Sequence, residues 1–176
     1  LVFILTSLFS LICFSQAGLQ PQYDAGIYAS KNFIVNSDFE AALTASKYVT
    51  DANSISSRST SSPLEGKASL LIDAATSGHL IQLKTKALDA KLAGGNCQAQ
   101  FYVSGDASLY KTAVFLSSTN LTGSYLQLEN VASGSRPVKM FFPCGASGDQ
   151  PVIEIQATSN SAAAIKVDSV YLGQCI

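Results

Sequence analysis

One segment of the chain places hydrogen-bonding and stacking groups at alternate positions. Residues 97–103 alternate in polarity, with Gln98, Gln100 and Tyr102 between a cysteine and apolar residues. Because successive side chains of a strand point to opposite faces, these three share the face away from the core. Amides and a phenol ring suit sugar hydroxyls and pyranose rings. The stripe is therefore a candidate glycan-binding surface. Further candidates, each near a strand end or loop, are Tyr48, Tyr110 and Tyr125.

Groups for catalysis are sparse. His79 is the only histidine, and it follows Thr76-Ser77-Gly78 without a recognisable nucleophile motif. The 12 acidic residues lie mostly at turns, with no motif for the facing carboxylates that glycoside hydrolysis needs. No glycine-rich phosphate loop precedes a helix. We therefore predict that the protein is not an enzyme.

The charge distribution excludes a nucleic-acid partner. The formal net charge is −1, and no two of the 11 basic residues are adjacent. Neutralising a phosphate backbone requires clustered Lys and Arg. Low charge with 47% hydrophobic residues also excludes a disordered chain.

The N-terminal segment 1–17 is typical of a signal peptide. Residues 1–14 are apolar and uncharged, and small residues at Ser15 and Ala17 predict cleavage after Ala17. The apolar run is shorter than the roughly 20 residues of a membrane-spanning helix, although a signal anchor is the alternative. With neither Met nor a basic residue at its start, the signal helix is expected to be incomplete. We predict a protein that is secreted or at the cell surface, with no membrane span after cleavage.

Three cysteines remain after cleavage, and export favours a disulfide. Cys97 opens an alternating run in phase with the apolar residues up to Val103. Cys144 closes another run, in phase with Val138 and Phe142. Both side chains should point toward the core from strand ends, so we predict a Cys97–Cys144 bridge. The remaining Cys175 is a possible contact with another chain.

Period-two alternation continues through most of the chain and predicts an all-β fold. Gly- and Ser-rich turns separate the expected strands, and residues 87–92 are the best, short helical candidate. The Ser-rich stretch 53–62 is expected to be an exposed loop or a poorly ordered edge. Many short strands of this kind favour a single β-sandwich, or jelly roll, of one domain. The expected strands are Asn32–Glu40, Lys67–Asp73, His79–Lys84, Asn96–Ser104, Leu109–Leu116, Tyr125–Glu129, Pro137–Phe142, Val152–Ala157 and Ala164–Leu172.

Four segments resemble a known family. Residues 32–40, NFIVNSDFE, are similar to the opening "NLIxNxxFE" strand of CenC-like carbohydrate-binding modules, in the galactose-binding-like jelly-roll superfamily. EGKASL at 65–70 is similar to "GKxSL", HLIQL at 79–83 to "xxxxQ", and IKVDSVYLG at 165–173 to "IxxDxVxLG". The resemblance covers residues 32–173. The chain departs from many members in having no Trp.

The resemblance implies one structural calcium ion that joins the first and last strands. Its side-chain ligands would be Glu40, from the "FE" step, and Asp168, from "VDSV", with backbone carbonyls supplying the remainder. Hard carboxylate and carbonyl oxygens suit calcium, and a metal that links the chain ends would close the sandwich.

The predicted layout is a signal peptide at 1–17, a polar lead-in at 18–31 and a galactose-binding-like β-sandwich at 32–176. By the resemblance, the function is that of a secreted, non-catalytic module that binds carbohydrate or another cell-surface ligand for adhesion. One alternative is a structural or interaction module of an extracellular fibre or surface assembly, without a ligand of its own. Another is an accessory module of a glycoside hydrolase.

Overall fold

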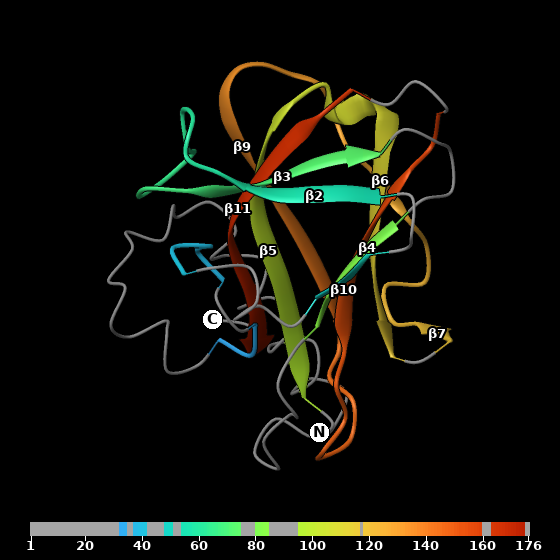
Figure 1. Ribbon diagram of the computed structural model, residues 1–176. Helices are drawn as coiled ribbons and strands as arrows, with labels where there is room; N and C mark the ends of the chain where they lie inside the picture. The colour runs from blue at the N-terminus through green and yellow to red at the C-terminus, as the bar shows by residue number, and fades with distance from the viewer. Residues whose placement is uncertain are drawn as a thin grey trace.

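The computed structural model describes residues 32–34, 37–41, 48–50, 54–74, 80–84, 95–116, 118–159 and 163–174. These residues form two antiparallel sheets with almost no helix, which confirms the predicted β-sandwich of jelly-roll type (Figure 1). The signal peptide, the polar lead-in, the helical candidate 87–92, His79 and Cys175 lie outside the described residues.

The first sheet, called here the β10 sheet, has the strand order β1-β4-β10-β6-β7, with β8 also pairing with β6. Its central strand β10 pairs with β4 on one side and β6 on the other along nearly its whole length. Strand β10 matches its predicted range residue for residue. The strands are β1 (Tyr48–Thr50), β4 (Leu80–Lys84), β10 (Val152–Ala157), β6 (Tyr110–Leu116), β7 (Thr119–Asn120) and β8 (Leu126–Gln127).

The second sheet, called here the β11 sheet, has the order β2-β3-β11-β5-β9. Strand β11 is central and pairs with β5 along most of its length, with an irregularity between Asp168 and Tyr171. A 3-10 turn, η4 (Ala107–Leu109), leads from β5 to β6. The strands are β2 (Ser54–Ser59), β3 (Ser69–Ala74), β11 (Ile165–Gln174), β5 (Asn96–Gly105) and β9 (Val131–Pro143).

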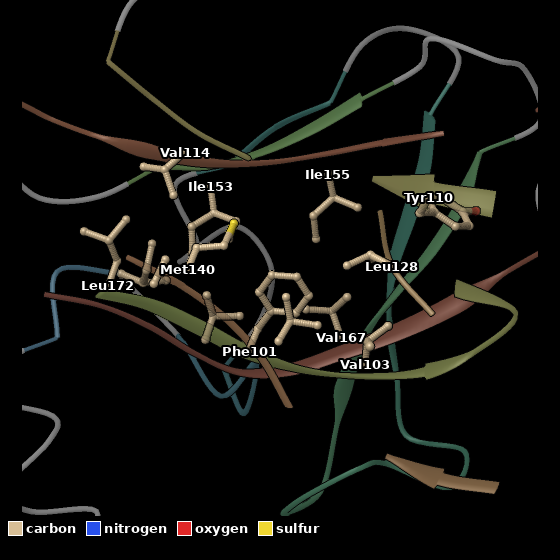
Figure 2. Close-up of a cluster of buried hydrophobic side chains, with 14 of the residues drawn as sticks. Phe101, Val103, Tyr110, Val114, Leu128, Met140, Ile153, Ile155, Val167 and Leu172 are labelled. Atoms are coloured by element: carbon tan, nitrogen blue, oxygen red, sulfur yellow. The ribbon is translucent and has the colours of Figure 1, made fainter. Parts of the chain in front are cut away.

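The core lies between the sheets and is filled by alternate side chains of their inner faces. Figure 2 shows Ile153 and Ile155 of one sheet opposite Phe101 and Val167 of the other. All four are at most 1% exposed. At about 25 cal/mol per Å² of apolar surface, this burial is the main contribution that stabilises the fold.

Residues 32–34 and 37 lie beside the C-terminal part of β11. Strand β3 pairs with β11 only through residues 165–167. Farther along, the Phe33 amide donates to the Leu172 carbonyl at 2.9 Å and the Val170 amide to the Ser37 carbonyl at 2.8 Å. The prediction of a continuous strand over 32–40 is wrong: among the described residues of this range, Ile34 forms a single bridge and a turn occupies Ser37 and Asp38. These residues therefore continue the sheet along the part of β11 that does not pair with β3.

Strands β2 and β9 also differ from the prediction. The stretch 53–62, expected to be an exposed loop or a poorly ordered edge, contains the edge strand β2, which pairs with β3 from Ser54 to Ser59. Main-chain hydrogen bonds to β3 hold this edge strand, so it needs little apolar alternation. Strand β9 begins at Val131, earlier than predicted. Its first half is solvent-exposed and has no alternating pattern, so the sequence does not reveal this part of the strand.

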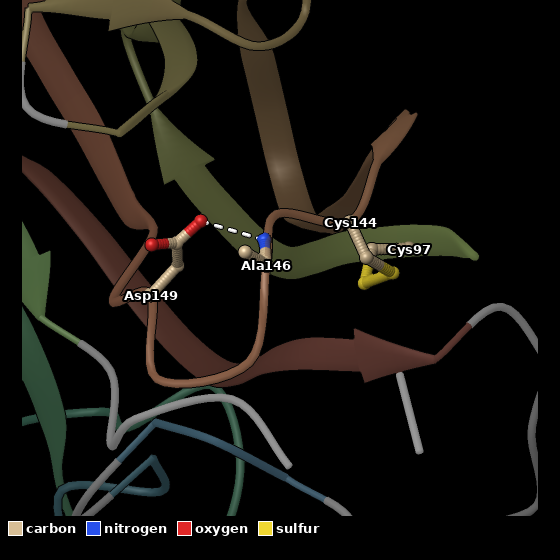
Figure 3. The surroundings of a disulfide bond; sticks show 4 residues. All are labelled: Cys97, Cys144, Ala146 and Asp149. Carbon is tan, nitrogen blue, oxygen red and sulfur yellow. Dashed lines mark hydrogen bonds between the residues drawn. A yellow bond between two sulfur atoms is a disulfide. The ribbon is translucent and has the colours of Figure 1, made fainter. Parts of the chain in front are cut away.

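The predicted Cys97–Cys144 disulfide is confirmed (Figure 3). It joins the start of β5 to the residue after β9, with the two Cα atoms 5.1 Å apart. Both cysteines are buried, and the Cys144 amide donates to the Gly95 carbonyl at 2.8 Å. Beyond the bridge, the turn is closed by the Asp149 carboxylate, which accepts from the Ala146 amide at 2.6 Å. The disulfide therefore fixes one end of the pair of strands β5 and β9.

The disulfide gives a stability prediction. Replacing both cysteines, C97A/C144A, should lower the free energy of unfolding by about 4 kcal/mol, the chain-entropy value for a loop of this length, since the bonded residues are 47 apart. Urea denaturation followed by circular dichroism measures the loss. Wild-type protein unfolded under a reducing agent should match the variant. An unchanged midpoint would show that the bridge does not restrict the unfolded chain as expected.

Candidate ligand-binding face

The outer face of the β10 sheet carries polar and aromatic side chains over a buried layer. Because Ile153 and Ile155 point into the core, their neighbours on β10 point outward. The register pairs Glu154 with Ala113 of β6 and Gln156 with Lys111. Lys111 of β6 and Glu154 of β10 therefore point to the same outer face of the sheet, from two strands that pair with each other.

Tyr125 crosses this face from the segment that precedes β8. Its hydroxyl donates a short hydrogen bond to Glu154 Oε1. Its ring lies 5.7 Å from the Phe115 ring, centroid to centroid, at an interplanar angle of 52°. The ammonium nitrogen of Lys111 lies 4.2 Å from the Tyr125 centroid, a cation–π contact. We call Tyr125, Glu154, Phe115 and Lys111 the Tyr125 cluster.

Local hydrogen bonds determine where Tyr125 lies. Strand β8 pairs with β6, and the Gln127 side-chain amide donates to the carbonyls of Ser108 and Tyr110, both at 2.7 Å. Before it, Asn120 Oδ1 accepts from the amide and the hydroxyl of Thr122, at 3.1 and 2.8 Å. The segment is therefore held against β6 on both sides of Tyr125.

The electrostatics of the Tyr125 cluster keep its phenol protonated. Glu154 is only 6% exposed although it lies on the outer face. Burial raises the pKa of Tyr125, and the hydrogen bond to Glu154 and its negative charge raise it further. The phenol is therefore a permanent donor to Glu154, and the carboxylate orients the ring.

The predicted stripe of Gln98, Gln100 and Tyr102 lies on the outer face of the other sheet. The Gln98 side-chain amide donates to Gln100 Oε1 at 3.2 Å, so the structure does bring these amides together. Gln100, however, is 4% exposed, which removes its side chain from the surface. Tyr102 is half-buried, and burial, followed by the charge of Glu65, raises its pKa. This stripe is packed more closely than expected for a binding surface.

The other candidate tyrosines have different places. Tyr110 is fully buried in the core and its hydroxyl donates to the Ala163 carbonyl at 2.8 Å, so its assignment as a surface ligand group is wrong. The alternation of β6 accounts for this, since Tyr110 is in phase with Val114. Tyr48 begins β1 opposite Leu83, and its side chain lies outside the described residues. Among the candidates, Tyr125 is the one that the structure places in a polar cluster.

Glu40, a predicted calcium ligand, contacts the turn before β3. Its Oε1 accepts from the amides of Lys67 and Ala68, at 2.6 and 3.2 Å. Gly66, with a φ of +56°, allows this approach, because a Cβ there would collide with Glu40 Oε1. The carboxylate thus fastens the turn to the N-terminal segment.

Asp168, the other predicted ligand, holds the same turn from β11. Its Oδ2 accepts from the Glu65 amide at 3.1 Å and the Ser69 hydroxyl at 2.7 Å. Its Oδ1 accepts from the Ser169 amide at 2.7 Å. Asp168 is 1% exposed, and burial raises its pKa to about 6, even though these hydrogen bonds lower it.

These contacts do not fit a calcium ion held by both carboxylates. Calcium binds lone pairs of oxygen, whereas Asp168 Oδ2 and Glu40 Oε1 each already accept from two donors and Asp168 Oδ1 accepts from one. Within the described ranges, no three acidic, histidine or cysteine side chains gather into one group. We therefore assign no chemistry here to a metal.

A separate pocket of about 390 Å³ opens beside the start of β11. Its lining includes Ser104, Ser135 and Lys166, whose ammonium group donates to the carbonyls of Ser61 and Ser62. No aromatic residue lines it. The pocket therefore lacks the ring that the Tyr125 cluster supplies.

The comparisons with known proteins concern the fold. No protein-family model and no curated protein sequence matches the chain. Among solved structures, the CBM22-1 xylan-binding domain of Paenibacillus barcinonensis Xyn10C is 13% identical, with a TM-score of 0.58 over 82% of this chain and 96% of that one. TmCBM61, solved with beta-1,4-galactotriose, is 12% identical, with a TM-score of 0.57 over 82% and 99%. The α-L-arabinofuranosidase MgGH51 is 12% identical, with a TM-score of 0.62 over 86% of this chain but 27% of that enzyme.

At these identities the similarity shows a shared fold. Carbohydrate-binding modules of jelly-roll architecture are among the proteins that have this fold. The predicted resemblance to such modules is therefore confirmed at the level of the fold. Assignment to the CenC-like family stays a prediction. The described residues include no helix that would qualify as a membrane span.

The Tyr125–Glu154 contact gives a prediction about coupling. Tyr125→Phe should destabilise the protein by about 1–3 kcal/mol, because it removes the phenol donor from the buried Glu154 carboxylate. Glu154→Leu should also be destabilising. In a double-mutant cycle measured by urea denaturation, the combined loss should fall short of the sum by about 1 kcal/mol or more. Strict additivity would show that the two side chains do not interact as described.

Proposed function

We propose that the protein is an exported, non-catalytic module that binds carbohydrate through the outer face of the β10 sheet. The observation that carries this proposal is the Tyr125 cluster. In it the Tyr125 ring is held by Glu154, lies next to the Lys111 ammonium group, and stands beside β10, which carries the Gln156 amide. Similarity in fold to a xylan-binding domain and to a module solved with a galactotriose supports the same class of ligand.

The cluster offers a sugar both apolar and polar contacts. Tyr125 and Phe115 are half-buried rings, and such rings present apolar surface to the C–H face of a pyranose. Lys111 supplies ammonium donors for hydroxyl oxygens, and Gln156, its partner in the register, extends the polar surface along β10. Phe115, Lys111 and Gln156 come from paired strands, so the binding face needs little ordering when a ligand binds.

Three contacts hold Tyr125 before any ligand arrives. Its hydroxyl is bound by Glu154, its ring packs on Phe115, and Lys111 lies over the ring. A fixed ring loses less conformational entropy on binding than a mobile one. Glu154 therefore acts as a positioning residue in this proposal, because its carboxylate is engaged by the phenol.

Export is supported by two features. The sequence of residues 1–17 is typical of a signal peptide. The Cys97–Cys144 disulfide is of a kind that persists in oxidising compartments. Attachment to a glycan-bearing surface follows as the role of such a module.

The proposal predicts which substitutions weaken binding. Tyr125→Ala and Lys111→Met should each weaken binding to a glycan identified on an array by about tenfold or more, a loss of about 1.4 kcal/mol. Isothermal titration with that glycan measures the loss, and thermal melting verifies folding. Tyr102→Ala, on the outer face of the other sheet, is the matched control and should bind like wild type.

Two results would contradict the proposal. One is the absence of binding by wild-type protein to any glycan on the array. The other is loss of binding in Tyr102→Ala together with normal binding in Tyr125→Ala, which would place the ligand on the β11 sheet.

A further inference from the structure

The Arg58 side chain of β2 contacts the backbone of residues 39–40. Its Nε donates to the Phe39 carbonyl at 2.8 Å, and its Nη2 donates to the Glu40 carbonyl at 3.0 Å. One planar guanidinium thus binds two consecutive carbonyls, which suits its forked arrangement of donors. The contact links positions 18 and 19 residues apart in sequence.

The backbone at Phe39 is shaped for this contact. Neighbouring carbonyls of an extended strand point in opposite directions, so one group does not reach both. Phe39 has a φ of +53°, in the left-handed region that a large side chain rarely adopts. Phe39 is also 1% exposed, so its side chain is anchored in the core while its carbonyl is bound by Arg58. Packing and the guanidinium together stabilise this otherwise unfavourable backbone conformation.

The same place collects oxygen atoms that would otherwise suit a metal ion. The carbonyls of Phe39 and Glu40 are bound by Arg58, and the Glu40 carboxylate is bound by amides of the turn at 67–68. A divalent cation on these carbonyls would meet the positive guanidinium and be repelled by it. The positive charge beside the Phe39 and Glu40 carbonyls is therefore supplied by the Arg58 guanidinium, where a metal ion would otherwise bind.

We infer that the Arg58 guanidinium is the cation that ties residues 39–40 to the β11 sheet, in place of the calcium ion that the family resemblance implies. The linkage continues through Glu40 to the turn at 65–69, and through that turn to Asp168 of β11. The chain thus joins its N-terminal segment, the turn before β3 and its last strand by hydrogen bonds alone. The fold should therefore need no calcium at this place.

The first test is a melting experiment on the wild-type protein. The midpoint of thermal unfolding is measured in excess calcium chloride and in excess EDTA, with magnesium chloride as a control for ionic strength. Equal midpoints in all three are expected. A midpoint that is higher in calcium than in both other conditions would overturn the inference, because ligand binding to the native state raises the melting temperature.

The second test uses substitutions at Arg58. Arg58→Met keeps the length of the side chain but removes its donors, and it should lower the midpoint by about 3–12 °C. Arg58→Lys retains a positive charge and should give an intermediate loss. The matched control is Arg136→Met on β9, because Arg136 has a side chain that is 54% exposed and pairs with Glu129 at the surface, so the midpoint should change little.

These variants distinguish the inference from its alternatives. A midpoint for Arg58→Met equal to that of wild type would overturn it. So would equal losses in Arg58→Met and Arg136→Met, since that result would indicate a general effect of removing charge. If Arg58→Met does not fold, the order of wild type above Arg58→Lys, with no effect of calcium on either, still supports it.

Discussion

Burial of one face of each sheet is the constraint on which the rest of the structure depends. Phe101 and Val167 meet Ile153 and Ile155 across the interface, and all four are essentially without solvent exposure (Figure 2). Because a register slip of one residue would turn these side chains outward, the register is strongly specified. The same register places Glu154 and Lys111 on the outer face. The proposed binding face is therefore a direct consequence of core packing.

Carboxylates with low exposure provide a second layer of organisation, and each has donors. Asp168 accepts from the Glu65 and Ser169 amides and the Ser69 hydroxyl, while Glu154 accepts from the Tyr125 phenol. A buried carboxylate without such donors would cost several kcal/mol. At Asp168 the result is a joined turn and strand, whereas at Glu154 it is an oriented ring on a surface. Similar chemistry thus has a structural use on one sheet and a proposed binding use on the other.

The sequence predicts what depends on local alternation. Strand β10 and the Cys97–Cys144 pair follow from period-two patterns whose apolar phase is unambiguous. Strand β2 does not, because a Ser-rich edge strand is held by pairing with β3 and has no pattern of its own. The Tyr125 cluster was predicted only in part. Tyr125 was a candidate, but Glu154 lies 29 residues away, and only the sheet order brings them together.

Roles of single polar groups are harder to predict than strands. The motif that includes Glu40 suggested a metal ligand, yet the partners of its carboxylate are amides of a turn, and Arg58 binds its carbonyl. No local pattern marks Arg58, which contacts this segment only because β2 forms. Likewise, Gln100 is buried although the alternation of β5 places it on the outward face.

The most direct test of the proposed binding face is a titration of isotope-labelled protein with a glycan ligand, followed by amide chemical shifts in NMR spectra. The account predicts that the largest shifts fall on β6, on β10 and around Tyr125, with small shifts on β5 near Gln98 and Tyr102. Largest shifts on β5 and β9, with β6 and β10 unaffected, would contradict it.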